Sequence, residues 1–286
     1  MNLKEWEESG KTFKHNGYST FFREEGEGRE LLLLHGFPTA SYDWKKIWPE
    51  LSGRFHLIAP DYIGYGFSEK PRNYSYSVFD HADQVERLLL EKGIRECGIL
   101  AHDYGDTVAQ ELLARHNERK LKTSIRYLCF LNGGIFPEVH HPILVQKLLL
   151  SPIGWLISNL LNEKSFSKNF SSIFGPNTKP DVKELNEFWS LVERSGGKEI
   201  YHRLIRYIPE RRMNRERWVG ALLKTSVPLR FINGGADPIS GSHMAQRYRE
   251  LVRSPDTVIL ENIGHYPQVE DPQGILRAFL AFADRV

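Results

Sequence analysis

The chain contains few of the residues that mark several large classes of protein. Only 2 of its 286 residues are cysteine, Cys97 and Cys129, which is too few for a disulfide framework or a four-thiolate zinc site. Both lie in apolar runs, where a small buried thiol is expected. Neither sign of charge dominates, because 38 Lys and Arg residues face 36 Asp and Glu residues. The resulting net charge of +2 is too small for a dedicated nucleic-acid-binding protein.

Long uninterrupted apolar runs and targeting segments are also missing. Residues 1–8 contain neither the apolar stretch nor the cleavage site of a signal peptide, which predicts a cytoplasmic protein. The most apolar stretch, residues 142–161, is interrupted by Lys147 and by Pro152-Ile153-Gly154. It therefore predicts helices that bury one face, with membrane contact as the minor alternative.

What is present is an alternation of strand-like and helix-like runs. Asn16-Gly17, between runs at 11–15 and 18–23, is typical of a β-hairpin turn. Further strands are expected at 31–34, 55–59, 97–101, 125–131, 228–233 and 257–260. Helices are expected at 75–92, 105–116, 241–252 and 272–284. The alternation predicts an α/β fold whose mostly parallel sheet carries helices on both faces.

The alternation stops between residues 135 and 218, where only helix-like stretches separated by glycine and proline occur. We therefore expect a core domain formed by residues 1–134 and 219–286, with residues 135–218 inserted as a helical cap. Parallel sheets bind ligands at the carboxyl ends of their strands. The ligand site is accordingly expected at that edge, beneath the cap.

Three polar residues directly follow predicted strands. Asp103 lies between the strand at 97–101 and the next helix, Asp237 follows the strand at 228–233, and His265 follows the strand at 257–260. A nucleophile, an acid and a base in this order match a catalytic triad. Ala101 and Gly105 supply the small residues that a sharp strand–nucleophile–helix turn needs. The chain has no Gly-x-Ser-x-Gly, so serine has no comparable position.

Each of the three residues also has a structural interpretation. Asp103 would serve as a helix N-cap, and Asp237 before Pro238 would serve as a turn former. An isolated histidine such as His265 is usually structural. The position of all three after core strands favours the catalytic interpretation.

These motifs resemble those of the α/β-hydrolase superfamily, in the branch with aspartate nucleophiles that contains epoxide hydrolases and haloalkane dehalogenases. The residues that carry the resemblance are His35-Gly36-Phe37-Pro38, Asp61 to Ser68, His102 to Gly105, and Gly264-His265. Segments 102–106, 132–137 and 217–222 are further similar to the mesoderm-specific transcript protein family. The resemblance implies an α/β-hydrolase fold with an eight-stranded sheet.

The same resemblance implies a mechanism. Asp103 would attack an sp³ carbon and form an alkyl-enzyme ester. His265, oriented by Asp237, would then activate the water that hydrolyses this ester. The backbone N–H groups of Phe37 and Tyr104 would form the oxyanion hole.

The cap is expected to select a small lipophilic substrate. Opening of an epoxide calls for phenol donors, and the only tyrosines between residues 135 and 218 are Tyr201 and Tyr207, of which Tyr207 is favoured. Release of a halide calls for N–H donors, for which Trp155 and Trp189 are the cap candidates. We therefore favour a lipophilic epoxide. A haloalkane dehalogenase and a non-catalytic hydrolase-fold binding protein are the alternatives.

The remaining polar residues receive structural interpretations. Asp106 is expected to complement the helix dipole, and His35 and His102 to support their loops. The histidines at 140, 141 and 202 lack metal-ligand spacing, so neither a metal nor another cofactor is expected. A basic run accompanied by Glu199, Glu210 and Glu216 predicts a solvated, ion-paired helix face; its members are Arg203, Arg206, Arg211, Arg212, Arg215 and Arg217.

Overall fold

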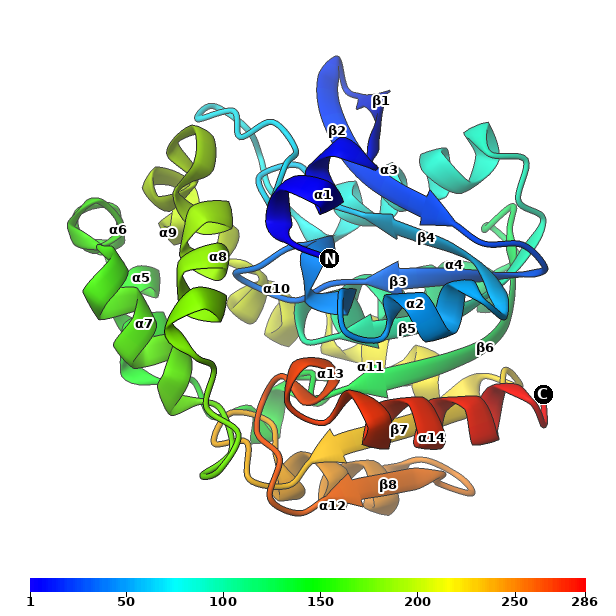
Figure 1. The fold of residues 1–286 in the computed structure, drawn as a ribbon. Helices are drawn as coiled ribbons and strands as arrows, with labels where there is room; N and C mark the ends of the chain where they lie inside the picture. The colour runs from blue at the N-terminus through cyan, green and yellow to red at the C-terminus, as the bar shows by residue number, and fades with distance from the viewer.

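An eight-stranded sheet runs through the centre of the computed structural model, which describes residues 1–286 (Figure 1). The strands are β1 (Lys11–His15), β2 (Tyr18–Glu25), β3 (Arg29–Leu34), β4 (Phe55–Pro60), β5 (Glu96–His102), β6 (Ser124–Leu131), β7 (Leu229–Gly234) and β8 (Thr257–Leu260). They lie in the order β1-β2-β4-β3-β5-β6-β7-β8. The pairs β1·β2 and β2·β4 are antiparallel, and all the other pairs are parallel. The predicted fold class is therefore confirmed.

Helices cover both faces of this sheet. One face carries α3 (Val78–Glu91), α4 (Tyr104–Asn117), α11 (Arg215–Lys224) and α12 (Ser242–Leu251), and the other carries α1 (Leu3–Glu8), α2 (Trp48–Ser52) and α14 (Pro272–Ala283). The pleat of β3 divides its leucines between the two layers. Leu32 and Leu34 pack in the first layer, and Leu31 and Leu33 pack in the second. A strand buried on both faces explains the continuous leucine run.

The cap lies beyond the carboxyl ends of the parallel strands (Figure 1). Its helices are α5 (Leu144–Leu150), α6 (Gly154–Leu160), α7 (Glu163–Ser172), α8 (Val182–Glu193), α9 (Tyr201–Leu204) and α10 (Tyr207–Met213). Asn162 begins α7 because its side chain accepts the Ser165 N–H at 3.0 Å. Phe170 of α7 then packs against Phe188 of α8, with ring centroids 4.9 Å apart. These aromatic contacts give the cap a core that is continuous with that of the sheet.

Helix α11 crosses residue 218, at which the sequence places the end of the cap. Its residues pack on α4 of the core: Trp218 Nε1 donates to Glu111 Oε2 at 2.9 Å, and Asn117 Nδ2 donates to the Ala221 carbonyl at 3.0 Å. The structural transition from cap to core thus lies before α11, near Asn214.

The outer part of the cap presents apolar side chains to solvent. The large exposed hydrophobic residues of this part are Leu144, Leu148, Ile153, Trp155, Leu156 and Leu160. None of the helices combines the length and the hydropathy needed to cross a bilayer.

Candidate active site

Asp103 occupies a strained turn between β5 and α4. Its backbone angles are φ 46° and ψ −102°, a region that a non-glycine residue rarely adopts. Gly105 lets α4 start close to β3, because a Cβ atom at this position would lie 2.2 Å from the Leu34 carbonyl oxygen. The turn therefore presents the Asp103 carboxylate at the carboxyl edge of the sheet, as strained functional residues often are.

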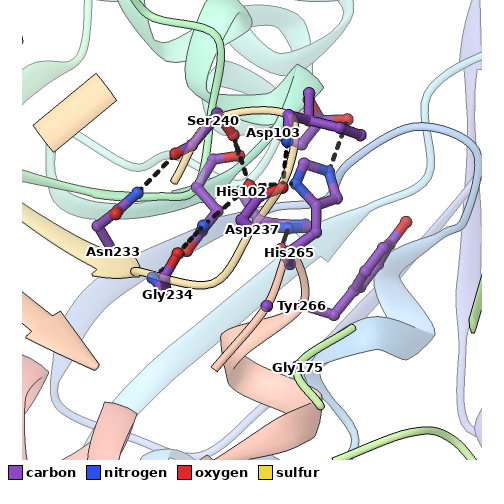
Figure 2. A network of polar contacts seen from close by, with 12 residues as sticks. His102, Asp103, Gly175, Asn233, Gly234, Asp237, Ser240, His265 and Tyr266 are labelled. Carbon is purple, nitrogen blue, oxygen red and sulfur yellow. Dashed lines mark hydrogen bonds and ion pairs between the residues drawn. The ribbon is translucent and has the colours of Figure 1, made fainter. Parts of the chain in front are cut away.

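Asp103, Asp237 and His265 meet at this edge (Figure 2). His265 Nδ1 donates to Asp237 Oδ2 at 2.8 Å, and His265 Nε2 lies 3.9 Å from Asp103 Oδ2. All three side chains are buried. The structure thus brings together the three residues that the sequence selects for a triad.

The Asp237 carboxylate is held by three further donors. Asn132 Nδ2 and Ser240 Oγ donate to Oδ2 at 3.0 and 2.8 Å, and the Ile239 N–H donates to Oδ1 at 2.8 Å. These bonds stabilise the ionised carboxylate and fix its direction. Asp237 is consequently a rigid acceptor for the His265 ring.

The His265 backbone is fixed from both the core and the cap. His102 Nε2 donates to the His265 carbonyl at 2.7 Å, and the His265 N–H donates to the Ile173 carbonyl at 2.9 Å. Glu270, in α13 (Pro267–Glu270), accepts the N–H groups of Gly264 and Tyr266 at 2.9 and 3.0 Å. His102 therefore supports the loop that carries His265.

The charges of the triad shift its pKa values. Burial alone would lower the pKa of His265, but the charges of Asp237 and Asp103 outweigh burial and raise this pKa to about 10. Burial opposes ionisation of Asp103, yet its contact with His265 and the charge of Arg211 hold the Asp103 pKa well below its usual value. Burial opposes ionisation of Asp237 as well, but His265 lowers its pKa, and the three shifts together favour a protonated His265 between two ionised carboxylates.

One donor of the expected oxyanion hole is in place at the Asp103 carboxylate. The Phe37 N–H donates to Asp103 Oδ2 at 3.1 Å. The Tyr104 N–H makes no hydrogen bond to this carboxylate. The Tyr104 side chain instead packs in the core, where its hydroxyl is hydrogen-bonded to His81 Nδ1 at 2.5 Å.

A cavity of about 70 Å³ opens beside His265. Of its 14 lining residues 10 are hydrophobic, and most of them come from the cap between Ile143 and Ile173. Phe37 and Pro38 of the core and Tyr201 of α9 also line it. Such a lining suits a small apolar molecule.

Tyr201 lines this cavity, whereas Tyr207 and Tyr65 do not line it but pack against Phe37 of its wall. Tyr201 lines the cavity, but its hydroxyl donates to the Pro38 carbonyl at 3.4 Å. The Tyr207 hydroxyl is buried and has no partner, and its ring lies 4.9 Å from the Tyr104 ring. Tyr65, after β4, also has a buried hydroxyl without a partner, and its ring stacks on that of Tyr104 with centroids 5.7 Å apart. In the sequence, Tyr65 is recognisable only as part of the motif from Asp61 to Ser68.

The two cap tryptophans do not line the cavity. Trp155 is 55% exposed on α6. Trp189 is buried behind the wall, with its ring 5.5 Å from that of Phe166. Trp155 was a candidate halide donor only because it is a tryptophan of the cap. The face of α6 that carries it points to solvent.

Two charged residues differ from their sequence interpretation. Asp106 is fully buried under Gly133, and burial together with the charge of Asp103 raises its pKa well above the usual value, so it does not act as an exposed partner of the helix dipole. Arg215 forms an ion pair with Glu216 of the expected run at 3.0 Å, but Arg215 and Arg217 also pair outside it, with Glu138 at 2.8 Å and the buried Glu111 at 2.7 Å. Arg211 of the same basic run is buried beside Asp103.

No group of three or more His, Cys, Asp or Glu side chains is clustered as metal ligands would be.

The family model described as the α/β hydrolase fold matches residues 30–152. The putative hydrolase LipZ of Mycobacterium tuberculosis is 34% identical over 98% of this chain and 97% of its own. The soluble epoxide hydrolase of a Corynebacterium species is 28% identical over 93% of this chain and 94% of its own.

Solved structures share the fold at lower identity. The haloalkane dehalogenase DbeA from Bradyrhizobium elkani superposes with a TM-score of 0.80 at 24% identity, over 96% of either chain. The epoxide hydrolase CorEH superposes with a TM-score of 0.74 at 23% identity, over 96% of this chain and 97% of its own. The mesoderm-specific transcript protein of Mus musculus is 44% identical over 98% of this chain and 87% of its own length. This likeness extends through core and cap alike, and the chain accordingly belongs to the mesoderm-specific transcript protein family of α/β hydrolases.

Proposed function

We propose that this α/β hydrolase opens small lipophilic epoxides through a covalent ester on Asp103. The observation that carries the proposal is the position of this carboxylate. It lies on a strained turn, with the Phe37 backbone nitrogen 3.1 Å from Oδ2 and the His265–Asp237 pair beside it, and His265 lines an apolar cavity. A carboxylate in such a position is suited to attack at carbon.

In the first step, an Asp103 oxygen bonds to one epoxide carbon and the C–O bond of the ring breaks. The electron pair of that bond remains on the substrate oxygen, which takes a proton from a phenol, and the protonated His265 then returns a proton to the phenolate. In the second step, His265 Nε2 accepts a proton from water, and the hydroxide attacks Cγ of Asp103. The bond between Cγ and the substrate oxygen then breaks, this oxygen takes the proton of the new carboxyl group, and the diol leaves with Asp103 ionised and His265 protonated again.

The charge balance explains why His265 acts only after the ester has formed. The charge of Asp103 helps to raise the His265 pKa to about 10, and a protonated imidazole cannot accept another proton. Esterification removes that charge and therefore lowers the His265 pKa. The imidazole becomes a base at the stage at which water must be activated.

The donors near Asp103 favour an epoxide over a haloalkane. The Tyr207 and Tyr65 hydroxyls are buried without partners, and a phenol O–H suits an oxygen that develops negative charge while attached to carbon. Indole N–H donors for a departing halide are missing from the cavity wall, since Trp155 is exposed and Trp189 lies behind Phe166. Haloalkane dehalogenation is therefore the second candidate, supported by the shared fold.

Trapping of the ester tests the proposal. With His265→Gln, we expect styrene oxide to add its full mass to the protein, and peptide mapping to locate the adduct on Asp103. The matched control is His265→Gln with Asp103→Asn, which should remain unmodified. Bromide release from a 1-bromoalkane that exceeds diol formation would favour dehalogenation. An unmodified protein across epoxides, bromoalkanes and activated esters would favour a binding protein.

A further inference from the structure

Arg211 reaches from the cap into the core at Asp103. Its side chain is 2% exposed, although it is located in the basic run of α10. Arg211 Nη2 donates to the Asp103 carbonyl at 2.9 Å and lies 3.6 Å from Asp103 Oδ1. Arg211 Nε donates to Thr107 Oγ1 at 2.5 Å, one turn along α4. The guanidinium is thus held at three points around the nucleophile turn.

Asp103 is the ionic partner of this buried cation. No other carboxylate lies within 4.0 Å of the Arg211 guanidinium. Glu210, the neighbouring acid on α10, accepts the Val78 N–H instead. A buried guanidinium is costly without a counter-charge, so the position of Arg211 depends on the ionised Asp103 carboxylate.

The two oxygens of the carboxylate have different partners. Oδ2 accepts the Phe37 N–H from the core, and Oδ1 faces Arg211 from the cap. The Tyr104 N–H, the second donor expected from the sequence, makes no bond to either oxygen. Arg211 stands on the side of the carboxylate that lacks a backbone donor.

We propose that Arg211 is a catalytic residue of ester hydrolysis, where it stabilises the negative charge that forms on the Asp103 carboxyl group. This role rests on the proposed function. During alkylation the carboxylate loses charge, so a nearby cation does not accelerate that step. During hydrolysis a neutral ester becomes a tetrahedral oxyanion, and the same cation lowers the barrier.

This asymmetry separates a catalytic role from a structural one. Arg211→Met should slow decay of the ester by tenfold or more, while its formation is not slowed. The ester should then accumulate during turnover, which lowers kcat and KM together. Arg211→Lys, which keeps the charge but not the planar group, should recover part of the decay rate.

One further variant is a control, and a second displaces Arg211 without removing it. Arg212→Met removes the same charge from the adjacent, exposed residue and should behave as the wild type. Gly134→Ala retains Arg211 but displaces it, because a Cβ atom at Gly134 would lie 2.3 Å from Arg211 Nη1. We expect Gly134→Ala to slow ester decay in the same direction as Arg211→Met, with both variants retaining a cooperative thermal transition.

The experiment is rapid-quench intact-protein mass spectrometry with styrene oxide, which measures formation and decay of the adduct separately. Unchanged decay in Arg211→Met, or equal slowing of both steps, would overturn the proposal. Urea unfolding of Asp103→Asn, Arg211→Met and their double variant measures the pairing without substrate. We expect a stabilising coupling that the equivalent cycle with Arg212→Met lacks, and its absence would also overturn the proposal. A wild type that forms no adduct while the coupling is present would instead refute the proposed function.

Discussion

At the scale of single residues, Tyr207 and Tyr65 have hydroxyl groups that are buried and unpartnered, whereas Tyr201 is already hydrogen-bonded. We therefore expect Tyr207→Phe to lower epoxide turnover by roughly 10²- to 10⁴-fold, since a general acid contributes that much. Tyr65→Phe should also lower turnover, and Tyr201→Phe should lower it least. Diol formation under saturating substrate measures all three.

If Tyr207 only packs in the cap, its phenylalanine variant will retain nearly full turnover, because the ring remains. A loss confined to Tyr201→Phe would identify a different donor and would require the Tyr201 hydroxyl to leave the Pro38 carbonyl during the reaction.

The residues of the triad were predictable because their signals are local. Asp103 directly follows β5, Asp237 and His265 lie in the loops after β7 and β8, and parallel strands end at one edge of the sheet. Arg211 and Asp106 were assigned to exposed faces, and their burial depends on which helix face the tertiary packing covers. The basic run predicts ion-paired arginines, and this holds for Arg215 and Arg217, which pair with Glu138 and Glu111.

At the scale of elements, the β5–α4 turn depends on a close approach of two backbones. We expect Gly105→Ala to lower the free energy of unfolding by about 1–3 kcal/mol, because its Cβ would lie 2.2 Å from the Leu34 carbonyl oxygen, which cannot move aside easily. Urea denaturation measures the change.

Gly220→Ala is the matched control for this substitution. Gly220 lies in α11, and a Cβ atom there meets no atom within 4 Å. Alanine has the higher helix propensity, so this variant should gain up to about 1 kcal/mol. Equal effects of the two substitutions would show that the approach of α4 to β3 does not constrain the turn.

Long periodic segments explain how much of the fold the sequence predicted. All eight strands, together with α3, α4, α12 and α14, lie within a few residues of the expected ranges. The short helices α1, α2 and α13 were missed, because one turn or so offers no measurable period. Helix α11 crosses the expected end of the cap. Its sequence continues the helical pattern of residues 135–218, but its side chains pack on α4 of the core.

At the scale of the whole molecule, the triad makes stability depend on pH. His265 has a pKa of about 10 in the folded protein and an ordinary value of 6.5. Between these values the folded state binds more protons than the unfolded state, so stability falls as pH rises. The contribution of His265 is fully present below about pH 6.5, and each unit of the raised pKa corresponds to about 1.4 kcal/mol.

Urea unfolding between pH 7 and 10 measures this dependence. We expect the free energy of unfolding of the wild type to decline with pH more steeply than that of His265→Gln. Lys70 acts in the opposite direction, because burial lowers its pKa to about 8. Subtracting the pH profile of His265→Gln from that of the wild type removes the contribution of Lys70, which both proteins share. Parallel profiles would contradict a protonated His265 in the resting site.

The two buried cysteines make the chain suitable for distance measurements by fluorescence. Cys97 lies in β5 and Cys129 in β6, and burial raises the pKa of the Cys97 thiol to about 12, so neither presents a reactive thiolate. Leu160→Cys on α6 and Leu90→Cys on α3 would introduce exposed thiols on the cap and the core (Figure 1). A dye pair on these positions would attach without background labelling. Energy transfer between the dyes would then follow the separation of cap and core in real time as substrate enters.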